Sequence, residues 1–121
     1  MKRSRLPNFS FEKEYLKSFD LVAGVDEVGV GALAGPVYIG IVIFDFSVSQ
    51  TLEKDVLSLK INDSKQLSIK ERERLEKEIF RYSLYASTHF STVSDINKVG
   101  IRKATQKAIR RGVSFTRITC K

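Results

Sequence analysis

Two short apolar runs, residues 21–25 and 37–44, are separated by a stretch rich in glycine, and the first run ends in two adjacent acids, Asp26 and Glu27. Apolar runs of this length fit strands better than helices. We expect a first strand over residues 21–27. We expect a second over residues 37–44 that is buried on both faces, because nearly all of its residues are apolar. A strand that delivers two carboxylates into a glycine-rich turn is typical of an active-site edge.

The N-terminal part is predicted to contain a basic arm and one helix. Residues 1–9 carry three basic side chains and a proline, which favour an extended arm. The aromatic residues Phe11, Tyr15 and Phe19 follow at intervals of four. This spacing predicts a short helix over residues 11–18 whose aromatic side chains pack in a core.

The middle of the chain is predicted to contain a helix and a third strand. Residues 51–59 fit either a loop or a single helical turn. Ser68 and Glu71 form a capping box, which predicts a helix over residues 68–80. Residues 81–93 are expected to form a strand paired with the second one. Strands interspersed with helices indicate an α/β fold.

The last predicted helix runs from Ser94 or Asp95 to about residue 111. Its apolar positions recur at helical spacing, and Gly100 is expected to kink it or delay its start. Two arginines followed by Gly112 resemble a helix stop signal. The nine residues after Gly112 could begin a fourth strand.

Charge is distributed unevenly along the chain, whose formal net charge is +7. Residues 1–95 hold 13 Lys/Arg and 14 Asp/Glu, whereas residues 96–121 hold 8 Lys/Arg and no acid. This asymmetry fits either a polyanionic partner such as nucleic acid or a solvated basic helix face. No apolar run approaches the roughly 20 residues of a membrane span. The single cysteine, Cys120, excludes an internal disulfide framework, and we expect a cytoplasmic protein without a membrane partner.

The acids Asp26 and Glu27 are a candidate metal site. Side chains alternate between the faces of a strand. Both residues can therefore serve one ion only if the chain bends or if one of them contributes its carbonyl oxygen. Hard oxygen ligands suit Mg²⁺ or Mn²⁺. The alternative is a pair of surface acids at a strand end.

Two further segments could contact a ligand through backbone or lysine groups. Gly29 and Gly31 could expose backbone N–H groups to phosphate or sugar oxygens. Residues 62–65 form an Asx/Ser turn whose Lys65 could hold a phosphate, although such a string is more often only a turn. His89, the only histidine, lies in a predicted strand and is assigned a structural role.

Three strings together resemble the type 2 ribonuclease H family, which includes bacterial ribonuclease HII. They are GVDEVGVGALAGP at residues 24–36, NDSKQLS at 62–68, and DINKVGI at 95–101 with Ala104 and Thr105 following. The resemblance covers residues 20–111 in the family's order.

The resemblance implies a ribonuclease H-like fold and cleavage of RNA within RNA–DNA hybrids, including ribonucleotides embedded in duplex DNA. It implies two divalent ions, Mg²⁺ or Mn²⁺, held by four carboxylates, of which Asp26 and Glu27 would be the first two. Gly29, Val30 and Gly31 would occupy the turn at the substrate's 2′-hydroxyl. Lys65 would contact backbone phosphate.

The chain departs from the family pattern at one contact residue and in its carboxylates. Val30 replaces an arginine, which removes a bidentate phosphate donor. No acid follows Asp95, so the third and fourth ligands have no candidates. We therefore expect one truncated ribonuclease H-like domain over residues 1–121, with a basic arm at 1–9 and a divergent tail at 112–121.

Truncation has consequences for fold and activity. The expected sheet has three antiparallel strands with about three helices, and the family's fourth and fifth strands are missing. The first strand would then be an exposed edge that could drive association. Activity is expected to be impaired. The alternatives are a catalytically inactive nucleic-acid-binding remnant and a non-functional gene fragment.

Overall fold

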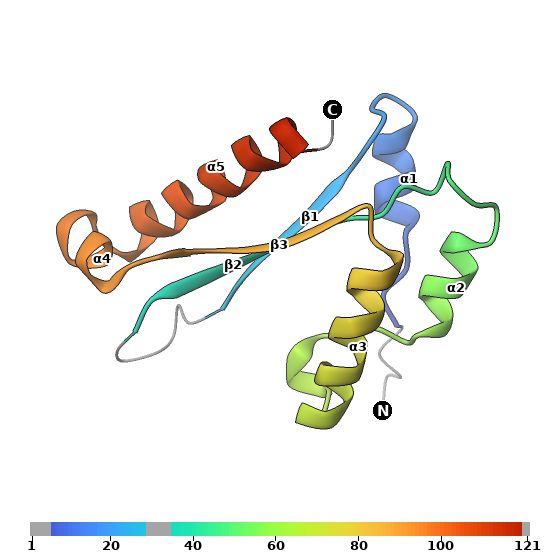
Figure 1. The fold of residues 1–121 in the computed structure, drawn as a ribbon, viewed down its shortest axis with the longest axis horizontal. Helices are drawn as coiled ribbons and strands as arrows, with labels where there is room; N and C mark the ends of the chain where they lie inside the picture. The colour runs from blue at the N-terminus through green and yellow to red at the C-terminus, as the bar shows by residue number, and fades with distance from the viewer. Residues whose placement is uncertain (1–5, 29–34, 120–121) are drawn as a thin grey trace. The chain divides into compact units, whose positions relative to one another are not determined.

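The computed structural model describes residues 6–28 and 35–119. Within these ranges the chain forms five α-helices, one short 3-10 helix and three strands (Figure 1). In chain order they are α1 (Ser10–Leu16), β1 (Ala23–Val28), β2 (Val37–Ile43), α2 (Leu52–Ser58), η1 (Ser64–Gln66), α3 (Ile69–Tyr82), β3 (Tyr85–Ser91), α4 (Val93–Val99) and α5 (Ile101–Thr119).

The elements group into two compact units. The first comprises Met1–Val22 with Phe44–Ser83, and the second comprises Ala23–Ile43 with Leu84–Lys121. The first unit contains α1, α2, η1 and α3, and the second contains the sheet with α4 and α5. The assignment of the whole chain to one domain stays a prediction.

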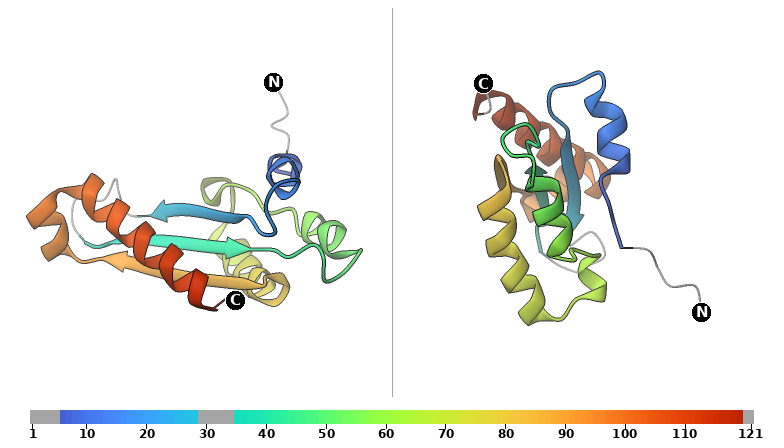
Figure 2. Two further views of the ribbon diagram at one scale, coloured as in Figure 1. Left: turned by 90° about the horizontal axis from the view of Figure 1, so that it is seen from above. Right: turned by 90° about the vertical axis from the view of Figure 1, so that its right-hand side faces the viewer.

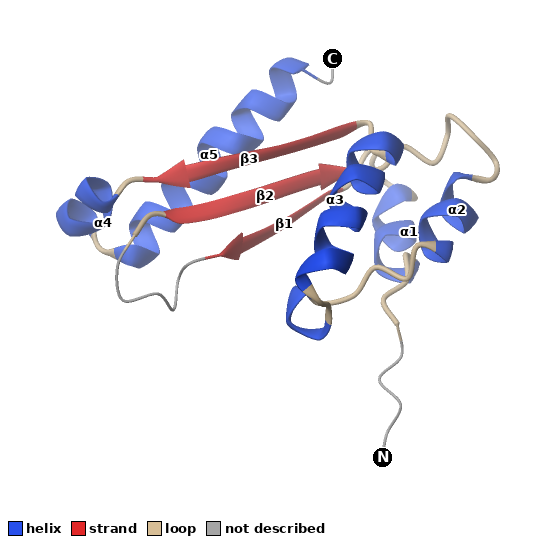
Figure 3. Ribbon diagram, turned by 60° about the horizontal axis from the view of Figure 1, so that its bottom comes forward, coloured by secondary structure: helices blue, strands red, loops and turns tan. Residues whose placement is uncertain are grey.

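The second unit is built on an antiparallel sheet with strand order β1-β2-β3, as Figure 3 shows. Asp26 on β1 lies opposite Gly40 on β2, which in turn lies opposite Thr88 on β3. The predicted three-stranded antiparallel sheet of an α/β fold is thereby confirmed. All six residues of β1 are exposed, so the expectation of an open edge strand also holds.

Burial on β2 alternates instead of covering both faces. Val37, Ile39 and Ile41 are fully buried, whereas Tyr38 between them is 46% exposed. Helix α5 packs on β2 and β3 from one side (Figure 2). The prediction that this strand is buried on both faces was wrong, because apolar content does not reveal how many faces other elements cover.

Helix α5 sits close to the sheet because small residues line its inner face. Ala104 and Ala108 are fully buried. At Gly112, an added Cβ would clash with Ile41 Cδ1 and lie 2.8 Å from His89 Cδ2, so glycine allows this close approach. The buried Ser91 hydroxyl donates a 2.6 Å hydrogen bond to the Ala104 carbonyl and fixes the helix to β3.

Gly112 does not end the last helix, contrary to the prediction. The helix continues to Thr119, so the segment after Gly112 does not start a fourth strand. The stop signal was misread because the glycine serves tertiary packing rather than a helix end.

Gly100 divides the predicted helix over residues 95–111 into two. With φ of 84° it follows α4 as the cap residue, a conformation that glycine adopts without strain. The N-cap of α4 is Thr92, and Asp95 is its capping-box partner, so neither Ser94 nor Asp95 is the cap itself.

In the first unit, the predicted capping box on α3 is confirmed. The Ser68 hydroxyl accepts a hydrogen bond from the Glu71 N–H at 3.2 Å, and the Ser68 N–H donates to Glu71 Oε2 at 2.9 Å. The backbone and side-chain hydrogen bonds from Ser68 hold the pKa of the Glu71 carboxyl below its ordinary value. A local sequence signal therefore located this helix start correctly.

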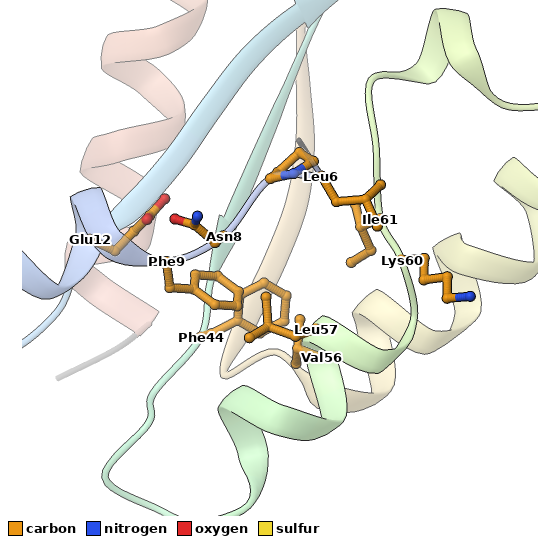
Figure 4. A pocket seen from close by; sticks show the side chains of 10 residues that line it. Leu6, Asn8, Phe9, Glu12, Phe44, Val56, Leu57, Lys60 and Ile61 are labelled. Atoms are coloured by element: carbon orange, nitrogen blue, oxygen red, sulfur yellow. The ribbon is translucent and has the colours of Figure 1, made fainter. Parts of the chain in front are cut away.

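Two other predictions for the first unit need revision. The predicted packing of Phe11, Tyr15 and Phe19 in a core was wrong: all three are exposed, Phe11 by 69%. The preceding Phe9 packs edge-on against Phe44 instead, with ring centroids 5.8 Å apart, beside an apolar pocket (Figure 4). The segment 51–59, whose sequence fits either a loop or a single helical turn, contains helix α2 over residues 52–58.

Candidate metal centre

The two candidate carboxylates lie near the end of β1. In this strand, residue 27 pairs with Ile39 and residue 26 pairs with Gly40. Cross-strand partners share a face of the sheet. The Glu27 side chain therefore lies on the same face as the buried Ile39, which α5 covers, and Asp26 lies on the opposite face.

The immediate surroundings of Asp26 are open. The Asp26 carboxylate accepts a 2.8 Å hydrogen bond from the Glu27 N–H, which occupies one carboxylate oxygen. Gly40, its cross-strand partner, would meet nothing within 4 Å if it carried a Cβ. The surface beside Asp26 is therefore clear of side chains on the side of β2.

β1 remains a regular strand through residue 28, so the side chains of Asp26 and Glu27 lie on opposite faces of the sheet. One ion could then contact the Asp26 carboxylate together with a main-chain carbonyl oxygen, which is the second arrangement considered from the sequence. Among the described residues, no group of three or more His, Cys, Asp and Glu side chains is gathered around a common point. Hard oxygen donors of the kind that Mg²⁺ and Mn²⁺ prefer are present, but in a small number.

Lys65 lies in the first unit, in the 3-10 helix η1. Its N–H donates to the Asp63 carboxylate at 2.9 Å, and the Asp63 N–H donates to the Asn62 side-chain oxygen at 2.8 Å. These two bonds fix the predicted Asx turn and leave Lys65 exposed. The remaining site predictions, Gly29, Val30 and Gly31, lie outside the described residues.

Sequence reasoning missed the neighbours of Asp26 on its own face. Gly40 and Thr88 lie beside it in register, and the exposed pair Tyr38 and Phe90 lies two residues further along, with ring centroids 5.9 Å apart. The alternation of side chains along β2 could have indicated these neighbours, because every second residue from Tyr38 faces away from the buried isoleucines. The sequence did not reveal this alternation, because nearly every residue of the run is apolar.

An antiparallel sheet with paired acids on its edge strand, interspersed with helices, is an α/β arrangement consistent with a truncated domain of the ribonuclease H-like class. The family model described as Ribonuclease HII matches residues 23–121. The chain therefore belongs to the ribonuclease HII family.

Curated relatives agree with this assignment. The chain is 44% identical over 108 residues to "Ribonuclease HII" of Bartonella bacilliformis, a match that covers 88% of this chain and 45% of the relative. It is 40% identical over 105 residues to "Ribonuclease HII" of Ligilactobacillus salivarius, covering 85% of this chain and 37% of the relative. The chain thus spans less than half the length of these relatives. No helix in the described ranges is long and apolar enough to cross a bilayer.

Proposed function

We propose that the chain carries part of the machinery of a divalent-metal-dependent endonuclease that cleaves RNA in RNA–DNA hybrids and at ribonucleotides embedded in duplex DNA. The observation that carries this proposal is the position of two family-motif carboxylates, Asp26 and Glu27, on a fully exposed edge strand. Buried acids would need charged or hydrogen-bonding partners, whereas the exposed carboxylates of Asp26 and Glu27 are open to an ion and a phosphate.

In this proposal Asp26 is the principal metal ligand and residue 27 contributes an oxygen from its carboxylate or main chain. A bound Mg²⁺ or Mn²⁺ would act as a Lewis acid on the scissile phosphodiester and lower the pKa of an attacking water. Lys65 neutralises a backbone phosphate, since its ammonium is exposed and its backbone is fixed by Asp63. By the family motif, Gly29, Val30 and Gly31 are assigned to the substrate's 2′-hydroxyl, and Val30 in place of arginine would weaken phosphate contact.

The 121-residue chain by itself should cleave poorly. Two-metal hydrolysis needs ligands that clamp both ions. The chain supplies no acid after Asp95, and the described residues gather no third carboxylate with Asp26 and Glu27. We expect cleavage to be at least about 100-fold slower than that of a family-length relative, since each lost ligand removes transition-state charge stabilisation.

Cleavage of a duplex containing one ribonucleotide, with Mg²⁺ or Mn²⁺ and then with chelator, tests the proposal. A slow, metal-dependent cut at the ribonucleotide should disappear in Asp26→Asn. Asp20→Asn, an exposed acid outside the sheet, is the matched control and should leave the rate unchanged. Metal-dependent cutting that survives Asp26→Asn would refute the assigned ligand. A rate equal to that of the Bartonella bacilliformis relative would refute the expected impairment.

A second candidate function is nucleic-acid binding without cleavage. It is favoured by residues 96–121, which hold 8 Lys/Arg and no acid. It predicts salt-sensitive binding to a hybrid that is unchanged in Asp26→Ala, together with no metal-dependent cutting. The third alternative, a non-functional gene fragment, predicts neither activity, and further acidic family motifs in another reading frame beyond Lys121 would support it.

A further inference from the structure

The edge of the sheet formed by β3 carries a basic hollow. His89 of β3 lines it together with Arg110, Arg111, Ser114 and Phe115 of α5. A smaller hollow shares His89 and Arg111 and continues along the strand to Thr88 and Phe90. Together they form one open surface along β3, which we call the β3 hollow.

Helix geometry aligns further cations with this hollow. Lys103, Lys107, Arg110, Arg111 and Ser114 follow one another at spacings of four, three, one and three, which places them on one flank of α5. All five are exposed. From Lys103 to Arg111 the helix rises about 12 Å, at 1.5 Å per residue. A row of that length matches several phosphates of a chain rather than one isolated anion.

The Arg111 charge in the β3 hollow is held in place but not neutralised by a backbone carbonyl. Arg111 Nη2 donates a 3.3 Å hydrogen bond to the Phe90 carbonyl, which leaves other guanidinium N–H groups available. Asp95 is an acid close enough to act on Arg111 and Lys107, but its carboxylate also accepts from the Thr92 N–H at 3.4 Å. The second unit as a whole holds 8 Lys/Arg and 3 Asp/Glu.

An exposed aromatic ring borders the same surface. Phe115 is 55% exposed and lies against the His89 ring with centroids 6.0 Å apart. Bases stack on exposed aromatic rings when they are unpaired, because a duplex covers the faces of its own bases. Cations beside aromatic rings are therefore the combination that a single-stranded nucleic acid recognises.

We propose that the β3 hollow binds a single nucleic-acid strand, with backbone phosphates on Arg110 and Arg111 and a base against the Phe115 and His89 rings. It lies on the opposite edge of the sheet from Asp26 and Glu27, two strand spacings or about 10 Å away. The inference shares the nucleic-acid partner of the proposed function but none of its metal chemistry.

Fluorescence anisotropy with a labelled 12-nucleotide single strand, measured over a series of salt concentrations in the presence of chelator, tests this site. Arg110→Gln with Arg111→Gln should weaken binding about tenfold and reduce the salt slope by about 1.4, from 0.7 per phosphate contact. Arg102→Gln is the matched single-charge control, on the same helix but outside the hollow, and should have a smaller effect than Arg110→Gln alone. The double lysine variant should restore most of the affinity.

A second pair of variants separates binding from folding, because Arg111 also holds the Phe90 carbonyl. Ser114→Glu places a negative charge in the hollow and should weaken binding severalfold, while Gln106→Glu adds the same charge elsewhere on α5 and should weaken it less. If each hollow variant lost no more affinity than its control outside the hollow, the effect would be one of net charge alone, and this result would overturn the site. Preference for duplex over single strand would overturn the base contact. The cleavage assay tests the proposed function separately. If the wild type cleaves and Asp26→Asn does not, while both bind the single strand equally, the proposed function stands whatever the arginine variants show about the β3 hollow.

Discussion

The two edges of the same sheet differ in both charge and cover. β1 is exposed at all six residues and carries Asp26 and Glu27. β3 has buried residues at both ends, Tyr85 and Ser91, and is flanked by the arginines of α5. The difference teaches that one small sheet can separate an acidic edge suited to a cation from a basic edge suited to a polyanion. The central strand β2 holds the two edges in register.

The largest expected effect comes from breaking the strand that both edges share. Ile39→Ala removes a fully buried side chain from the middle of β2 and should cost about 3 kcal/mol of unfolding free energy. Tyr38→Ala, its half-exposed neighbour, is the control and should cost less than half as much. Urea unfolding measures both. Equal losses would mean that β2 is not packed on one face as described.

The next largest effect should be a destabilisation of the β3 edge that leaves β1 unchanged. Gly112→Val would force a side chain against Ile41 and His89, and overpacking of this kind should cost about 2 kcal/mol. Ser114→Val places the same side chain on an exposed position of the same helix and isolates the lower helix propensity of valine. Hydrogen exchange should rise in β3 and α5 of the Gly112 variant. A Gly112 variant as stable as its Ser114 control would contradict the close approach.

How far the sequence predicted the fold depends on whether each signal was local. The Ser68–Glu71 capping box located α3 correctly because both partners are three residues apart and need no tertiary contact. Gly112 looked like a helix end by the same local rule, but its role is set by Ile41 and His89, which are distant in sequence. Local rules cannot identify such partners.

The candidate site shows the same division. The adjacency of Asp26 and Glu27 is a sequence fact, but strand alternation alone left open whether the chain bends there; β1 stays regular, so the two side chains diverge. The basic flank of α5 was visible as a charge excess, but its hollow was not, because His89 joins it only through the packing of α5 on β3. His89 therefore appeared to be only structural.

A smaller, pH-dependent effect is expected just after β3, at the cap of α4. Hydrogen bonds from Thr92 hold the pKa of the Asp95 carboxyl below its ordinary value of 3.8. A lowered folded pKa adds stability above 3.8, and this contribution is lost as pH falls through the folded pKa. Thr92→Ala should therefore destabilise the chain at pH 7, and the difference from wild type should narrow below about pH 3.8. Thr92→Ser should retain the effect, and urea unfolding at pH 7 and pH 3 measures it. A difference that does not change with pH would contradict this cause.

The smallest effect on folding should come from the open edge itself. Val28→Lys changes an exposed residue at the end of β1 and should alter unfolding free energy by less than about 0.5 kcal/mol. It should nevertheless reduce any concentration-dependent association in sedimentation experiments, because lysine on an edge strand opposes strand pairing. Val48→Lys, on an exposed loop, is the control. Equal association in all three proteins would show that β1 does not drive it.

The small-residue face of α5 also determines which way its cations point. Ala104, Ala108 and Gly112 lie on the buried face of the helix, which packs on the sheet. Each residue turns an α-helix by about 100°. Inserting one uncharged residue between Ala108 and Arg110 would therefore rotate Arg110 and Arg111 away from the β3 hollow without changing the net charge. The recognition chemistry of this edge is encoded in the phase between its smallest side chains and its arginines, so a chain of equal net charge but shifted phase should fail to bind.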